Sequence, residues 1–115
     1  MIIANFKSNG SEQMIVRWVQ DFISNIDNNH TAIGIAPPYT YIEKLGRLLC
    51  DSNQNNLKVG AQDVGVGSGA KTGSVSSSML ADLNCNFAIV GHSERRTIFN
   101  ESNELIRECF RKNCR

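Results

Sequence analysis

Three side chains able to handle charge and protons follow apolar segments that have the character of strands. Lys7 comes directly after the apolar run 1–6, and His92 and Glu94 come shortly after the run 87–90. A lysine ammonium at a strand end can bind an anionic substrate and stabilise charge that develops during reaction. A histidine at a helix start tends to stay neutral, because the helix N-terminus disfavours a positive charge on the ring. Such a histidine can donate a hydrogen bond to a carbonyl oxygen.

Each of these residues also has a structural interpretation. Lys7 can be an ordinary surface lysine, and His92 can be a loop histidine held by structural hydrogen bonds. Glu94 can act as an acid or base near Lys7 if both loops open on one face of the sheet. It can also form an ion pair with Arg95 or Arg96, and we take that ion pair as the default for Glu94.

The glycine-rich segment 65–73 imitates two phosphate-binding motifs. Ala70 stands where a P-loop has its second glycine, so its methyl group would crowd the phosphate cradle. Gly65, Gly67 and Ala70 fit a dinucleotide fingerprint, which also needs a following helix and an acidic residue at the next strand end. The acidic residue closest to that strand end is Glu94. A surface loop that contacts a partner is the favoured interpretation, with a nucleotide-binding loop as the alternative.

The elements that must position these residues alternate along the chain. Four short apolar runs are typical of strands buried on both faces of a parallel sheet; they are 1–6, 31–36, 57–61 and 87–90. A helix is predicted to start at Ser11, and others after Pro37-Pro38, at 76–78 and near Ser102. The first helix places Ile15, Trp18, Val19, Phe22 and Ile26 on one face, and the second has Ile42, Leu45 and Leu49 facing inward. The apolar residues of the third are Met79, Leu80 and Leu83, and those of the fourth are Leu105, Ile106, Cys109 and Phe110.

The order βαβαβαβα predicts an α/β fold with a parallel sheet and right-handed connections. Residues 1–115 are predicted to form one partial domain of about four βα units, with no second domain. Four parallel strands leave two edges with unpaired backbone groups, and a closed eight-stranded barrel would remove those edges. We therefore expect the chain alone to be marginally stable or to depend on a partner.

The composition of the chain gives no indication of a nucleic-acid-binding, membrane or metal-binding protein. The 115 residues are 41% hydrophobic and 20% charged, with a formal net charge of +1, which gives no indication of nucleic-acid binding or of an acidic membrane surface. No segment is long and apolar enough to span a bilayer or to act as a signal peptide, so a cytoplasmic location is predicted. The four cysteines (Cys50, Cys85, Cys109 and Cys114) lack metal-site spacing and are predicted to be free thiols.

Taken together, four motifs in this order resemble the triosephosphate isomerase family. The motifs are Asn5-Phe6-Lys7-Ser8-Asn9-Gly10, Gly60-Ala61-Gln62-Asp63, Gly69-Ala70-Lys71-Thr72-Gly73 and Gly91-His92-Ser93-Glu94-Arg95-Arg96. The resemblance implies the N-terminal half of a (β/α)8 TIM barrel. It also implies interconversion of dihydroxyacetone phosphate and glyceraldehyde 3-phosphate through an enediolate, with a small phosphorylated triose as substrate and with no metal or organic cofactor.

The resemblance assigns roles to individual residues. Asn5 and Lys7 match the substrate-binding asparagine and lysine, and Lys7 would also stabilise the enediolate. His92 matches the electrophile that polarises the substrate carbonyl, which the family keeps as a neutral imidazole. Glu94 matches the active-site glutamate near the lysine, and Ser93 would contact the catalytic base in its swung-out position.

The resemblance also implies a homodimer, with Thr72 at the tip of the loop that enters the neighbouring subunit. Lys71 stands where the family usually has an aromatic residue, and Ser74 where a glutamate usually pairs with an arginine across the interface. An exposed cation in an apolar socket is costly unless it is paired, so these two residues weaken the expectation of the usual dimer.

The family's base glutamate, lid and later phosphate-binding loops belong to the half that follows the fourth βα unit. We therefore expect residues 1–115 alone to have negligible isomerase activity. Two alternatives remain: a non-catalytic half-barrel that self-associates, and a small nucleotide-binding α/β domain.

Overall fold

The computed structural model describes residues 1–26, 31–67 and 69–113, and it contains a four-stranded parallel sheet. The strands lie side by side in chain order: β1 (Ile2–Asn5), β2 (Ile33–Ala36), β3 (Leu57–Ala61) and β4 (Phe87–Ala88). Every neighbouring pair is parallel, which confirms the predicted α/β fold. β3 has the predicted bounds, whereas the other three strands are shorter than the predicted runs.

The helices are α1 (Glu12–Asn25), the 3-10 turn η1 (Tyr39–Tyr41), α2 (Ile42–Asp51), α3 (Ser77–Asp82), α4 (Ser93–Ile98) and α5 (Asn103–Asn113). The predicted helix starts are confirmed at Ser11 and Ser76, whose hydroxyl oxygens accept hydrogen bonds from Met14 N–H and Met79 N–H.

Two helices follow the fourth strand, one at the helix start expected beside His92 and one at the start predicted near Ser102. The short helix α4 precedes α5, and it ends because Asn100 adopts a left-handed backbone with φ of 55°. The next amide, Glu101 N–H, then turns back to donate to Arg95 O at 3.2 Å. This geometry satisfies a carbonyl at the helix end and separates α4 from α5.

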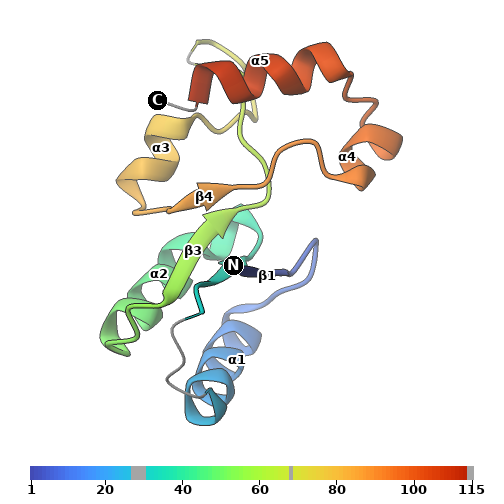
Figure 1. Ribbon diagram of the computed structural model, residues 1–115. Helices are drawn as coiled ribbons and strands as arrows, with labels where there is room; N and C mark the ends of the chain where they lie inside the picture. The colour runs from blue at the N-terminus through green and yellow to red at the C-terminus, as the bar shows by residue number, and fades with distance from the viewer. Residues whose placement is uncertain (27–30, 68, 114–115) are drawn as a thin grey trace.

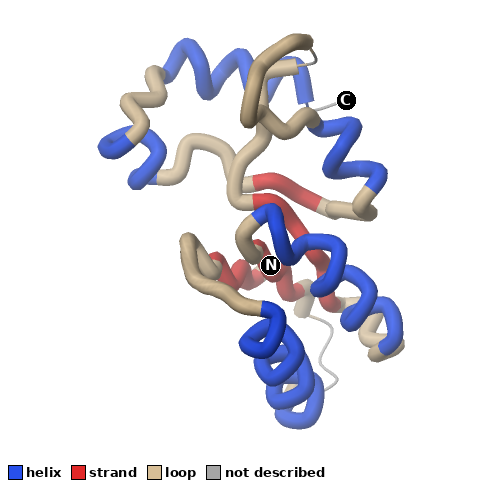
Figure 2. Tube along the Cα trace, turned by 180° about the vertical axis from the view of Figure 1, so that it is seen from behind, coloured by secondary structure: helices blue, strands red, loops and turns tan. Residues whose placement is uncertain are grey.

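The hydrophobic core lies between the sheet and the helices α1 and α2, which Figure 2 shows on one side of the strands. Its fully buried side chains include Ile15 of α1, Ile35 of β2, and Ile42 and Leu45 of α2. These residues confirm the inward faces predicted for the first two helices. Because apolar burial is the main favourable term in folding, this layer holds the end of the sheet that carries β1 and β2.

The apolar residues of the later helices are buried only in part. Leu80 and Cys109 are buried, but Met79 is 56% exposed and Phe110 is 62% exposed, and Leu105 is also exposed. Figure 1 shows the cause: α3, α4 and α5 lie beyond β4, on the far side from α1. A strand of two residues offers little surface to cover, so only a narrow stripe of each helix is buried.

The opposite face of the sheet carries no core helix among the described residues. Here the ring of Phe87 covers two glycines of neighbouring strands, Gly34 and Gly60. A Cβ atom added to Gly34 would lie 2.7 Å from the Phe87 ring and 3.4 Å from Ile3 Cγ1. The side chains of Ile3 and Phe87 therefore occupy the space beside Gly34 that a side chain at this position would need.

The cysteines of the described residues, Cys50, Cys85 and Cys109, are free thiols, and Cys114 lies outside those residues. Burial raises the pKa of Cys85 and of Cys109, which favours the protonated thiol in both. Within the described ranges, the helices are too short or too polar to cross a membrane.

Candidate active site

The loop after β1 holds Lys7 in an unusual backbone conformation. Lys7 has φ of 52°, a left-handed geometry that is rare outside glycine and costs about 1–3 kcal/mol. The side-chain oxygen of Asn5 accepts the Lys7 N–H at 2.9 Å. Asn9 donates from its backbone N–H and from its Nδ2 to Phe6 O, at 3.1 and 3.0 Å. Short-range hydrogen bonds therefore stabilise the turn that presents Lys7.

His92 lies at the junction of β4 and α4, where the chain turns at Gly91 with φ of 68°. It is the N-cap residue of α4, and its Nδ1 accepts a hydrogen bond from Glu94 N–H at 3.1 Å. Because a backbone N–H can only donate, Nδ1 carries no proton in this contact. The ring proton then lies on Nε2, and Nε2–H is the group that can donate to a ligand.

Lys7 and Glu94 form an ion pair across the sheet, with Lys7 Nζ 2.7 Å from Glu94 Oε1. β2 and β3 separate β1 from β4, a span of roughly 14 Å at the usual strand spacing, so two long side chains must point toward each other. This contact corrects the default interpretation of Glu94: it pairs with Lys7, not with Arg95 or Arg96. The hydrogen bond from Lys7 lowers the pKa of Glu94, which keeps the carboxylate ionised at neutral pH.

His92 lies beside the same pair, and its bond to Glu94 is the one that Nδ1 accepts from Glu94 N–H, not a bond to the carboxylate. Its Nδ1 lies 3.5 Å from Glu94 Oε2, and its side chain is 29% exposed. The structure therefore brings together the three residues that were expected to handle charge, Lys7, His92 and Glu94. Ammonium, imidazole and carboxylate in one cluster can bind an anion, donate to a carbonyl oxygen and keep the ammonium oriented.

The other predicted site residues, Asn5, Ser93 and Thr72, take no part in the contacts between Lys7, Glu94 and His92 except through the Lys7 turn. Asn5 uses its side-chain oxygen in the Lys7 turn, and its Nδ2 has no hydrogen-bond partner in the part of the chain that is described. Ser93 is exposed in the first turn of α4. Thr72 is exposed in the loop between β3 and α3, where Lys71 Nζ donates to Val66 O at 2.5 Å.

Two arginines after His92 form structural contacts that sequence reasoning did not assign. Arg95 pairs with Asp63 at 2.9 Å and with Glu101 at 2.6 Å. Arg96 donates to Gly91 O at 2.8 Å. Burial raises the pKa of Asp63 despite its contact with Arg95. The Arg95 bridge ties the end of β3 to α4 and so supports the position of Glu94.

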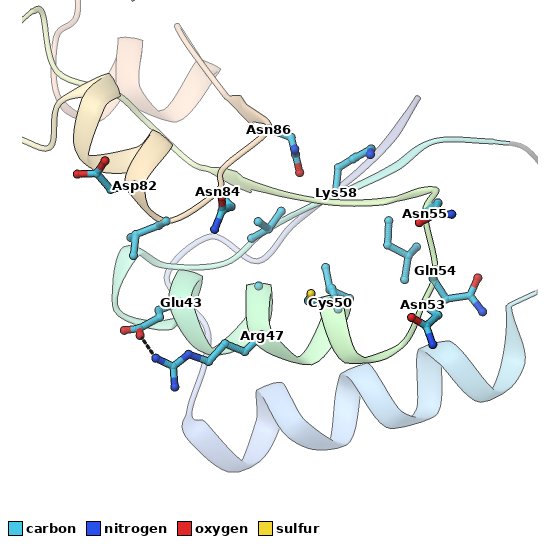
Figure 3. A pocket seen from close by; sticks show the side chains of 15 residues that line it. Glu43, Arg47, Cys50, Asn53, Gln54, Asn55, Lys58, Asp82, Asn84 and Asn86 are labelled. Atoms are coloured by element: carbon cyan, nitrogen blue, oxygen red, sulfur yellow. Dashed lines mark hydrogen bonds and ion pairs between the residues drawn. The ribbon is translucent and has the colours of Figure 1, made fainter.

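A large groove lies elsewhere on the described part of the chain. It has a volume of about 1070 Å³ and is lined by α2 and by the segments that lead into β3 and β4. Figure 3 shows its polar side chains, among them Glu43 paired with Arg47, and Gln54, which precedes β3. The groove is thus at the N-terminal ends of the strands, whereas Lys7 and His92 follow the C-terminal ends, where α/β folds bind ligands.

Known proteins resemble this chain over nearly its whole length. The family model described as triosephosphate isomerase matches residues 1–115. Curated triosephosphate isomerases from Methylococcus capsulatus, Shewanella piezotolerans and Blochmanniella floridana are 36%, 34% and 38% identical over 92%, 96% and 95% of this chain. The matches cover 42%, 44% and 43% of those proteins, so the chain spans less than half the length of the curated relatives it matches.

Proposed function

Since this chain belongs to the triosephosphate isomerase family, we propose that residues 1–115 supply the substrate-binding lysine and the electrophilic histidine of an isomerase. The reaction is the interconversion of dihydroxyacetone phosphate and glyceraldehyde 3-phosphate through an enediolate, in the cytoplasm. The four βα units would form the N-terminal half of a TIM barrel. The catalytic base, the lid and the remaining phosphate contacts would come from the other half.

The observation that carries the proposal is the cluster of Lys7, Glu94 and His92 at the C-terminal ends of one parallel sheet. In the proposed mechanism, the Lys7 ammonium attracts the phosphate dianion and stabilises the enediolate oxygen. Nε2–H of His92 polarises the substrate carbonyl, because Nδ1 is already engaged by Glu94 N–H. Glu94 orients Lys7 and partly neutralises its charge until substrate binds.

A chimera tests this proposal directly. Residues 1–115 would be joined to the C-terminal remainder of the Blochmanniella floridana relative, which is 38% identical over the shared part. We expect the chimera to isomerise glyceraldehyde 3-phosphate and residues 1–115 alone to show negligible turnover, because proton abstraction needs a positioned base. A coupled assay for dihydroxyacetone phosphate measures both.

The control for the chimera is its folding, followed by circular dichroism. A folded chimera without turnover would contradict the assignment of the site residues. Turnover by residues 1–115 alone, near that of the chimera, would contradict the proposed division of the site between two halves.

A second candidate function, self-association of half-barrels, is favoured by the exposed edge of the sheet. β1 ends the sheet, and its residues Ile2 and Ile3 are 62% and 45% exposed. Unpaired strand edges with apolar side chains favour pairing with another chain. The homodimer implied by the family stays a separate proposal that involves Thr72, Lys71 and Ser74.

Sedimentation of residues 1–115 is expected to show concentration-dependent oligomers, and Ile3→Lys should shift the distribution to monomers. Met79→Lys on α3 is the matched control, because Met79 is also an exposed apolar residue, at 56% against 45% for Ile3, but does not lie on β1. If the unsubstituted chain sediments as a folded monomer at all concentrations, self-association through β1 is wrong.

A further inference from the structure

Both backbone groups of Lys7 are held by side chains from outside its own residue. Asn5 Oδ1 accepts the Lys7 N–H at 2.9 Å, and Gln62 Nε2 donates to Lys7 O at 2.7 Å. Lys7 is neither glycine nor asparagine, yet its φ is 52°, a conformation that persists only where surrounding contacts enforce it. The two side chains are the contacts that fix its peptide groups on either side.

Gln62 does more than satisfy one carbonyl. Its Nε2 also donates to Ala36 O at 2.9 Å, so the amide contacts the loop after β1 and the last residue of β2. Ala36 O accepts the Phe6 N–H as well, at 3.0 Å. One carboxamide from the end of β3 thus joins the C-terminal ends of three adjacent strands.

The cost of a left-handed backbone at a non-glycine residue is similar in size to the net contribution of one or two neutral hydrogen bonds. The bonds from Gln62 and Asn5 are together sufficient to hold Lys7 in this conformation. Without Gln62, Lys7 O would lose a partner, and the balance would move toward the ordinary right-handed or extended backbone, which aims the side chain elsewhere.

We propose that Gln62 is a positioning residue for Lys7: its carboxamide locks the left-handed turn that points the Lys7 ammonium at Glu94 and into the site. The effect of Gln62 on catalysis rests on the proposed function. Its effect on the backbone conformation of Lys7 can be measured without substrate. Both carbonyl contacts use the same nitrogen, Nε2. The side chain must therefore be long enough to reach both carbonyls and must carry two N–H donors.

The test is Gln62→Met, which keeps the side-chain size and removes both donors. The amide-to-Hα NOE within Lys7, strong when φ is positive, should weaken, and the pKa of Glu94 should rise toward 4.5, its ordinary value. Gln54→Met is the matched control, since the Gln54 side chain has no hydrogen-bond partner among the described residues and faces the groove at the other end of the sheet (Figure 3). The control should change neither signal.

The unsubstituted protein provides a measurement that does not depend on how well a variant folds. The two Nε2 protons of Gln62 should exchange with solvent more slowly than those of Gln54, because both are donated. Equal exchange rates, or an unchanged Lys7 NOE in folded Gln62→Met, would overturn the proposal.

Different results would contradict the isomerase function and the positioning role of Gln62. An inactive chimera with the expected Lys7 and Glu94 signals would reject only the isomerase function. In an active chimera, Gln62→Met should lower kcat/KM about tenfold, the effect expected from weakening one hydrogen bond that orients a charge, while Gln54→Met leaves it unchanged.

Discussion

In the chimera, Lys7→Met is expected to lower kcat/KM for glyceraldehyde 3-phosphate by about 10³-fold, the loss typical of removing a donor aimed at developing charge. Methionine has a similar length and no charge, so it removes both the attraction for the phosphate and the stabilisation of the enediolate. Steady-state kinetics measure the loss. A change confined to KM would assign Lys7 to binding alone.

The same substitution has a signature in residues 1–115 without substrate. Loss of the hydrogen bond from Lys7 should return the pKa of Glu94 toward 4.5, as followed by NMR of its carboxyl carbon. Since the folded-state pKa of Glu94 lies below its ordinary value, the pair stabilises the fold at pH above that ordinary value. The contribution is lost as the pH falls through the lowered pKa, and Lys7→Met should abolish this part of the pH dependence.

Lys44→Met is the matched control for Lys7→Met. Lys44 also forms an exposed lysine–glutamate ion pair, with Glu12, but it connects α2 to α1 outside the site. Its replacement should leave kcat/KM unchanged and cost at most about 1 kcal/mol of stability. Equal losses of activity from the two variants would mean that Lys7 acts only through folding.

His92→Asn is expected to lower kcat in the chimera by about 10²–10³-fold while leaving the free energy of unfolding nearly unchanged. The asparagine oxygen can accept the Glu94 N–H as Nδ1 does now, and asparagine is a good N-cap residue. No donor then occupies the position of Nε2. Kinetics of the chimera, together with urea unfolding of the same protein, separate the two effects.

His92→Ala is the contrasting variant, because it removes the cap as well as the donor. It should show a similar loss of kcat and an added loss of stability of about 1 kcal/mol. If His92→Asn keeps full activity, His92 is a structural N-cap and not the electrophile.

The sequence predicted the parallel sheet and the first two helices because their signals are local. Buried strands without alternation, and apolar residues such as Ile15 and Val19 at helical spacing, depend on nothing outside each segment. The serine N-caps are equally local, since the hydroxyl of Ser11 bonds only three residues away.

The later helices were predicted less well because their environment is set by a distant element. The exposure of Met79 and Phe110 follows from the shortness of β4, which no pattern within α3 or α5 reports. The division between α4 and α5 depends on a left-handed asparagine, Asn100. Asparagine is only enriched in that conformation, so its presence alone does not predict a helix end.

For the candidate site, the sequence indicated which residue types meet but not how they pair. Glu94 has two arginines beside it in sequence, yet its partner is Lys7, 87 positions away. That choice depends on Arg95 being already engaged by Asp63 and Glu101. The role of Gln62 could not be predicted either, because no sequence pattern indicates which backbone carbonyls a glutamine after a strand will contact.

The position of the Phe87 ring over Gly34 and Gly60 makes the residue types allowed at these three positions, on three strands, depend on one another. A methyl group at either glycine would lie within 2.7 Å of the ring, so alanine at either position requires the ring to shift or a smaller residue at position 87. With the ring in its present position, both glycine positions exclude a Cβ atom. The uncovered face of the sheet therefore couples the choice of residue across three strands, independently of the chemistry at the strand ends.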